Sequence, residues 1–274
     1  MQNHIVQVKN ASFSYGEKRI FSDISFFVKS KEVLCIIGPN GCGKTTLLDC
    51  ILGVLKLEQG EVLIGQKNLD NIKPNQLAEK VAYVPQVHRR TFPYTVRDIV
   101  LMGRAYKTNI FSSPDEGDME ITNEAMEKVG ILHLADRPYT QISGGQCQLV
   151  MVARALAQQP RVIIMDEPTS HLDFKNELMV LETVADLVKQ NNISVIMATH
   201  FPNHAYYFET NGILTTLALM NNERFEEIGS PGEILNENNI KKIYGVNSKV
   251  LNCNIDKTTF IRQIVPLSIV KEAQ

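Results

Sequence analysis

The sequence lacks long hydrophobic runs, a marked excess of charge of one sign, and a regular cysteine pattern. No apolar run approaches the 18 or so residues that a membrane-spanning helix needs, and the first residues lack the apolar core of a signal peptide. Lysine plus arginine (28) nearly balance aspartate plus glutamate (30), which argues against a nucleic-acid-binding protein. The five cysteines form neither a Cys-x-x-Cys pair nor an even disulfide framework. We therefore expect a soluble cytoplasmic protein with reduced thiols.

The composition is that of an ordinary globular protein, and the predicted secondary structure changes along the chain. Apolar residues make up 44% and charged residues 21% of the 274 positions, enough to bury a sizeable core. At roughly 150 residues per domain, the length allows one or two domains. The chain reads as strand-rich, then helical from about residue 85 to 159, then strand–helix–strand. This order predicts an α/β fold.

Hydrophobic patterning places the individual elements. Val33–Ile37 is a continuous apolar run, as expected of a buried strand in a parallel sheet. Other short β-branched or apolar runs predict strands at 4–8, 24–28, 61–64, 81–84, 162–165 and 193–197, and a hairpin that turns at Asn221-Asn222. Helical spacing predicts helices that start near 44 and span 95–102, 120–129, 144–158 and about 177–189, with a polar loop over 108–117.

Gly38–Thr45 fits the pattern GxxxxGK[ST] and stands between the buried strand and a predicted helix. This is the setting that a phosphate-binding loop requires. Its glycines let backbone N–H groups wrap a phosphate, and the following helix presents its positive end. We expect Lys44 to reach the β- and γ-phosphates of a nucleotide and the Thr45 hydroxyl to bind Mg²⁺.

A second apolar strand, 161–165, runs into the carboxylates of Asp166 and Glu167. Ligands of α/β sheets bind at the carboxyl ends of strands. We expect Asp166 to hold the Mg²⁺ shell and Glu167 to polarise an attacking water molecule. Read alone, the two carboxylates could simply end a strand, but a neighbouring phosphate loop favours the catalytic interpretation.

Ile142–Gln146 predicts a second anion-binding helix terminus. Ser143 is a natural N-cap, and Gly144-Gly145 leave the backbone accessible where the helix begins. Taken alone, this segment is more simply an ordinary helix start.

Together and in this order, the motifs resemble those of the ATP-binding subunits of ABC transporters. Gly38–Thr45 matches the Walker A loop, Asp166 ends Walker B, and Ile142–Gln146 matches the LSGGQ signature. The further matches are Gln86 for the Q-loop, 170–173 for the D-loop, His200 for the switch histidine, and Tyr15 for the aromatic that stacks on adenine. The resemblance covers about residues 4–235. An ordinary P-loop kinase or GTPase does not account for the signature or for His200.

The resemblance implies a P-loop NTPase (RecA-like) core with an antiparallel β subdomain and an inserted α-helical subdomain. The ATPase domain would span 1–235, with its core at about 1–87 and 160–235 and the helical subdomain at about 88–159. Residues 236–274 would form a short C-terminal extension, which we expect to serve packing rather than regulation.

It also implies a head-to-tail homodimer with two ATP molecules at the interface. Catalytic roles fall to Glu167, His200, Gln86 and Lys44, and Mg²⁺ binding to Thr45, Gln86 and Asp166. One subunit would contact ATP through Tyr15, Gly38, Pro39, Asn40, Gly41, Cys42, Gly43, Lys44, Thr45 and Thr46. The other subunit would contribute Ser143, Gly144, Gly145, Gln146 and Asp173.

Some positions depart from the family pattern or invite another interpretation. Cys147 stands where a basic residue is common, and Ile142 replaces leucine. Cys42 lies at a helix amino end, a setting that lowers a thiol pKa, and we expect ATP to shield it from alkylation. His200 and His204 are four residues apart, but the intervening Pro202 and the lack of a third ligand argue against a metal pair. His88-Arg89-Arg90 is expected to be a solvated turn.

Two further segments are similar to importers of iron–siderophore, haem and cobalamin type, and would also suit molybdate or tungstate importers. They are Thr95–Arg104 and the tail at 229–235 and 240–246. The leading hypothesis is an ATPase subunit, peripheral on the inner face of the membrane, that drives metal-chelate import. It would act through a separate permease and, indirectly, a substrate-binding protein, with no nucleic acid. The rival is a soluble ABC ATPase without a permease, acting in nucleic-acid repair or on ribosomes.

Overall fold

The computed structural model describes residues 4–86, 92–107, 114–254 and 260–270. A six-stranded sheet forms its centre, in the order β10-β9-β3-β8-β7-β6. The bounds are β3 (Glu32–Ile37), β6 (Val81–Val84), β7 (Val162–Asp166), β8 (Ser194–Thr199), β9 (Leu214–Asn221) and β10 (Arg224–Gly229). Only β10 is antiparallel to its neighbour, whereas β9, β3, β8, β7 and β6 are mutually parallel. The predicted hairpin is therefore confirmed as β9–β10.

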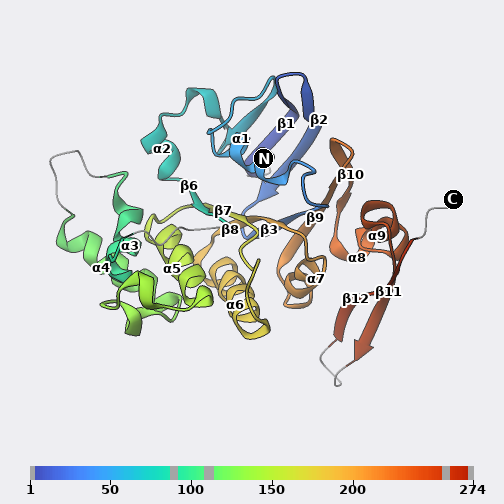
Figure 1. The fold of residues 1–274 in the computed structure, drawn as a ribbon. Helices are drawn as coiled ribbons and strands as arrows, with labels where there is room; N and C mark the ends of the chain where they lie inside the picture. The colour runs from blue at the N-terminus through green and yellow to red at the C-terminus, as the bar shows by residue number, and fades with distance from the viewer. Residues whose placement is uncertain (1–3, 87–91, 108–113, 255–259, 271–274) are drawn as a thin grey trace.

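Side chains of β3 divide between the two faces of this sheet. Val33, Cys35 and Ile37 join the core beneath α5 (Gly144–Ala157), α6 (Phe174–Asn191) and α7 (Asn203–Thr210). Leu34 and Ile36 join the core on the opposite face, under α1 (Lys44–Ile51). All five side chains are fully buried, because alternate residues of a strand point to opposite faces and both faces are covered. Figure 1 shows these layers.

An antiparallel sheet in the order β2-β1-β4-β5 covers the α1 face of the central sheet, as Figure 1 shows. Its strands are β1 (His4–Tyr15), β2 (Lys18–Lys29), β4 (Gln59–Ile64) and β5 (Lys67–Asn68). The short helices η1 (Leu69–Asn71) and α2 (Pro74–Ala78) then lead into β6. The structure thus combines a mixed α/β core with an antiparallel β layer, as expected.

Helices α3 (Val96–Leu101) and α4 (Glu116–Lys128) pack against α5 at the far end of the sheet, to the left in Figure 1. Short 3₁₀ turns complete this part: η2 (Met102–Arg104), η3 (Leu132–Leu134) and η4 (Tyr139–Gln141). Asp115 caps α4 in a capping box, so Glu116 and Gly117 are helical. The predicted loop over 108–117 is therefore wrong at its end, while 108–113 lie outside the described residues.

The end of the chain adds α8 (Pro231–Ile234), α9 (Glu237–Tyr244) and a hairpin of β11 (Val246–Asn254) and β12 (Phe260–Ile269). The hairpin packs against α7 and α9, on the right in Figure 1. Asn203 of α7 makes two hydrogen bonds to the backbone of Ile264, donating at 3.2 Å and accepting at 2.8 Å. Among the described residues, no helix is long and apolar enough to cross a membrane.

Candidate functional site

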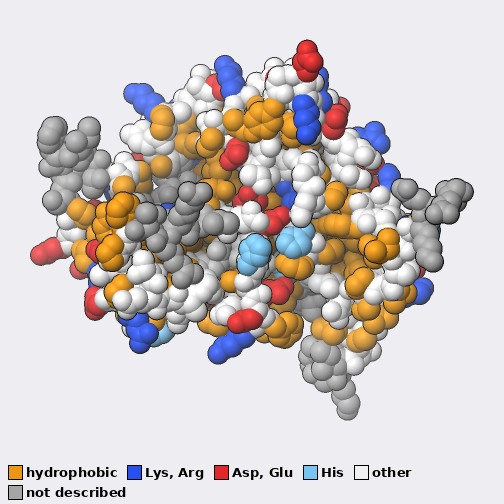
Figure 2. Space-filling view, viewed as in Figure 1, with side chains coloured by type: hydrophobic (Ala, Val, Ile, Leu, Met, Phe, Trp, Pro, Cys, Tyr) orange, Lys and Arg blue, Asp and Glu red, His pale blue; other side chains and the backbone are white. Residues whose placement is uncertain are grey.

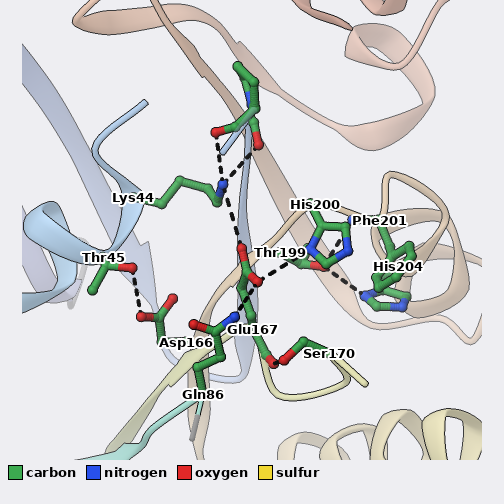
Figure 3. Close-up of polar contacts among 12 residues, drawn as sticks. Lys44, Thr45, Gln86, Asp166, Glu167, Ser170, Thr199, His200, Phe201 and His204 are labelled. Atoms are coloured by element: carbon green, nitrogen blue, oxygen red, sulfur yellow. Dashed lines mark hydrogen bonds and ion pairs between the residues drawn. The ribbon is translucent and has the colours of Figure 1, made fainter. Parts of the chain in front are cut away.

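The carboxyl ends of β3, β7 and β8 meet at one edge of the central sheet. In the parallel register, Ile37 lies opposite Thr199, and Asp166 lies opposite Ala198. The three segments that follow these strands therefore begin side by side. Figure 3 shows their polar side chains converging, although they come from positions up to 160 residues apart.

The phosphate loop has the backbone that its glycines permit. Gly41 (φ 80°) and Gly43 (φ 105°) lie in the left-handed region that favours glycine. At Gly38 a side chain would not fit, because an added Cβ would lie 2.1 Å from the carbonyl oxygen of Met220. Lys44 opens α1 and is 5% exposed. Its ammonium donates to the carbonyl oxygens of Gly38 (2.8 Å) and Pro39 (3.2 Å).

Thr45 connects this loop to β7. Its hydroxyl donates a hydrogen bond of 2.7 Å to Oδ2 of Asp166, which is 3% exposed. Burial raises the pKa of Asp166, and the hydrogen bond from Thr45 offsets part of that effect. The other carboxylate oxygen, Oδ1, is buried without a hydrogen-bond partner among the described residues. A hydroxyl beside a carboxylate oxygen of this kind fits Mg²⁺, which takes oxygen ligands and keeps several waters.

Glu167 is the point on which the other groups converge. One carboxylate oxygen accepts a hydrogen bond from Nε2 of Gln86 (2.8 Å) and lies 3.4 Å from Nδ1 of His200. The other oxygen lies 3.8 Å from the Lys44 ammonium. The backbone of Glu167 has φ 45°, a conformation uncommon for a non-glycine residue, and its N–H donates to the Ala198 carbonyl. The structure thus brings all four predicted catalytic residues together.

His200 follows β8 directly, and its side chain is about one-third exposed. Its ring packs on that of Phe201, with centroids 4.0 Å apart. In the space-filling view, histidine and acidic side chains gather near the middle of this face, between the helical part and the C-terminal part (Figure 2).

The signature segment has the predicted cap. Ser143 accepts a hydrogen bond from the Gln146 N–H, and the Gln146 side chain accepts one from the Ser143 N–H, which forms a capping box at the start of α5. Gly145 packs closely on Asn176 of α6, since a Cβ there would lie 2.2 Å from that side chain. Asp173 caps α6 by accepting from the Asn176 N–H at 2.8 Å.

The structure does not bring every predicted residue to this edge of the sheet. No hydrogen bond or ion pair of the described residues joins Ser143–Gln146 to the phosphate loop. Tyr15 ends β1, is 53% exposed and touches Phe13 edge-on. His88-Arg89-Arg90 lies outside the described residues.

The expected low pKa of Cys42 is wrong. Burial raises the pKa of this thiol above its usual value and outweighs the lowering effects of the Lys44 charge and of nearby backbone N–H groups. The thiol lies over Gly38, as the 2.8 Å separation between its Sγ and a Cβ built at Gly38 indicates. Cys147 is buried in the helical part of the core.

Contacts behind the site were not predicted from the sequence. As a residue pair, His200 and His204 suggested only a metal site, yet the structure pairs His204 with Glu177, 27 positions earlier. Its other neighbour is Thr199, at the end of β8. No local signal reveals such a pair, because the two helices that carry it meet only in the folded chain.

Comparisons with known proteins agree with this geometry. A family model described as ABC transporter matches residues 21–170. An iron chelatin transport ATP-binding protein of Helicobacter pylori is 39% identical over 200 residues, which cover 73% of this chain and 78% of that protein. The molybdate import ATP-binding protein MolC of Haemophilus influenzae is 33% identical over 266 residues, 97% of each chain. The hemin import ATP-binding protein HmuV of Bordetella pertussis is 32% identical over 255 residues, which cover 90% of this chain and 94% of that protein.

Among solved structures, a chain of an inward-facing ABC transporter described as metal-chelate type superposes with a TM-score of 0.84. It is 33% identical, and the match covers 97% of this chain and 98% of that chain. The fold is therefore that of a P-loop ATPase of the ABC class, as the motifs indicated. The chain belongs to the ABC transporter family as an ATP-binding subunit, an enzyme that hydrolyses ATP to ADP and phosphate in a reaction coupled to transport.

Proposed function

We propose that this chain energises the import of a metal chelate through a separate membrane permease. The observation that carries the proposal is the likeness along nearly the whole chain to a metal-chelate type transporter. The names of three relatives, which refer to iron chelatin, molybdate and hemin, support the same class of cargo. The chain itself would sit on the cytoplasmic face of the membrane, and a substrate-binding protein would act on the other side of the permease.

In this proposal, Lys44 and the backbone N–H groups of the phosphate loop hold the β- and γ-phosphates. Residues 38–46 form this phosphate-binding site, and Tyr15 stacks on the adenine. Thr45, Asp166 and Gln86 hold Mg²⁺, which neutralises charge on the phosphates when bound. The unpartnered Oδ1 of Asp166 supports that assignment.

Glu167 acts as the base towards the attacking water. Its orientation is set from several sides, because Gln86, His200 and Lys44 all lie against one carboxylate. His200 contacts the γ-phosphate and helps to position the water. Gln86 contacts Glu167 and comes just before the helical subdomain in the sequence, so it is placed to transmit a change in nucleotide state to that subdomain.

A second copy of the chain completes the site. The start of α5 carries a capped helix terminus whose Ser143 and Gly144 are exposed, and such a terminus binds anions. In a head-to-tail homodimer, Ser143–Gln146 and Asp173 of one subunit would face the ATP that the other subunit holds. The two helix termini, α1 and α5, would then bind one nucleotide from opposite sides, and closure on ATP with opening after hydrolysis would drive transport.

The division of the chain follows from these roles. We propose an ATPase domain over 1–235, with a helical subdomain at about 88–159 set into a core of 1–87 and 160–235. Residues 236–274 are a C-terminal extension, whose β12 packs on α7 and whose α9 contacts β9.

Co-purification tests the proposal. The Glu167→Gln variant, which should hold ATP without hydrolysing it, is extracted from membranes in mild detergent with Mg-ATP. A polytopic membrane protein recovered in equal amount, together with a bound or transported metal chelate, is the expected result. Recovery only from the soluble fraction, alone or with nucleic acid or ribosomes, would contradict the import proposal and favour an ABC ATPase that acts without a permease.

A further inference from the structure

His204 is a buried histidine that none of the proposed ATP, Mg²⁺ or dimer contacts uses. It lies in the first turn of α7, four residues after His200, and only 2% of its surface is exposed. Both ring nitrogens have partners: Nδ1 lies 3.1 Å from Thr199 Oγ1, and Nε2 lies 2.7 Å from Glu177 Oε1. Figure 3 shows His204 to the lower right of His200, joined to Thr199 by a dashed line.

These hydrogen bonds form a continuous series in which each group donates to the next, from the Phe201 N–H to Glu177. The Phe201 N–H donates to Thr199 Oγ1 at 3.1 Å, so the Thr199 hydroxyl proton is available to donate to Nδ1 of His204. With Nδ1 accepting that proton, the ring proton lies on Nε2 and donates to Glu177. We assign this tautomer because it satisfies every group in the chain. The hydrogen bond from His204 also lowers the pKa of Glu177, which keeps that carboxylate ionised.

This series of hydrogen bonds connects two elements that serve the ATP site. At one end, Glu177 lies in the first turn of α6, directly after the Asp173 cap. At the other end, the Phe201 N–H is the first backbone group after His200. The Phe201 ring packs against both histidines, with its centroid 4.0 Å from that of His200 and 5.2 Å from that of His204. The backbone position of the switch histidine is thus tied to α6 through a buried polar link.

We infer that His204, held by Glu177, is a positioning residue for His200. It touches neither nucleotide nor water itself; it fixes the turn from which His200 reaches Glu167 and the γ-phosphate. A displacement of about 1 Å in a catalytic group is enough to slow a reaction by up to 10²-fold, so a tether of this kind affects rate more than ATP affinity. The inference rests on the proposed role of His200.

The test compares steady-state ATPase kinetics of full-length variants. His204→Phe keeps an aromatic ring but removes both hydrogen bonds. We expect kcat to fall about tenfold while KM for ATP stays within about twofold. His204→Gln places an amide donor near Nε2 and should recover kcat to within about threefold of the unaltered chain. Glu177→Gln removes the charge from the same link while keeping the shape of this partly exposed side chain, and should lower kcat about threefold.

The decisive comparison uses a His200→Ala background. A residue that acts through His200 has nothing left to position there, so His204→Phe should cause no further loss of kcat. Glu182→Gln, on the exposed side of α6, is the matched control and should leave kcat unchanged. The inference is overturned if His204→Phe and Glu177→Gln keep full kcat, or if His204→Phe lowers kcat equally in both backgrounds. If His200→Ala alone keeps full kcat, the proposed role of His200 fails first.

Discussion

The Thr45 hydroxyl donates a hydrogen bond of 2.7 Å to the Asp166 carboxylate, although 121 positions separate the two residues. This bond joins the phosphate loop to the end of β7, and it aims a hydroxyl and a carboxylate at the same space. It also stabilises the ionised form of a buried acid whose pKa burial would otherwise raise further. A hydroxyl and a carboxylate oxygen in this arrangement fit a divalent cation, which we propose is Mg²⁺.

Removing the Thr45 hydroxyl should weaken Mg²⁺ binding more than ATP binding. For Thr45→Val, we expect the Mg²⁺ concentration that gives half-maximal ATPase activity to rise about tenfold or more. Thr45→Ser keeps the hydroxyl and should stay within about twofold of the unaltered chain. The measurement is a Mg²⁺ titration of phosphate release at saturating ATP. An unchanged Mg²⁺ requirement in Thr45→Val would contradict the assignment of this pair to the metal.

Cys42 should react slowly with alkylating agents. Because burial raises its pKa, little thiolate is present near pH 7.5, and its alkylation rate should continue to climb as the pH rises above about 9. Iodoacetamide labelling followed by peptide mass analysis gives the rate, with the exposed Cys253 as the internal comparison. We expect Mg-ATP to slow labelling of Cys42 and leave Cys253 unaffected. Equal labelling of Cys42 with and without Mg-ATP would show that the nucleotide does not cover it.

The C-terminal hairpin should contribute to stability through Asn203. Asn203→Ala removes both hydrogen bonds to the Ile264 backbone, and leaves partly buried groups of β12 without those partners. We expect the free energy of unfolding to fall by about 2 kcal/mol in urea titrations. Asn211→Ala, which loses one exposed hydrogen bond to Tyr207, is the control and should cost less than about 0.5 kcal/mol. Equal losses would mean that the hairpin is not anchored by Asn203.

The sequence predicts well those features that neighbouring residues in the chain determine. The phosphate loop could be placed because a buried strand, Val33–Ile37, and a helix near Lys44 flank it in the chain. Parallel strands bring their carboxyl ends to one edge, so the meeting of Lys44, Asp166 and His200 also follows from the order of elements. The central fold and the ends of its strands were predictable for the same reason.

What the sequence does not predict depends on contacts between distant segments. The helix after His200 was missed because Pro202 and polar residues hide its pattern, and its support comes from Glu177 and from Ile264. The pairing of β12 with β11, and the position of β12 on α7, were not predicted either. The pKa of Cys42 was misjudged because a local rule about helix ends omits the burial that tertiary packing imposes.

Trapping the Glu167→Gln variant with ATP tests the central claim most directly, namely that Glu167 drives hydrolysis of ATP that two subunits share. We expect kcat to fall at least about 100-fold while ATP binding is kept. Analytical ultracentrifugation with Mg-ATP should then show a dimer that retains two ATP per pair. The double variant that also carries Ser143→Arg should be monomeric under the same conditions. A variant that hydrolyses ATP at the unaltered rate, or one that binds ATP but stays monomeric, would contradict the account.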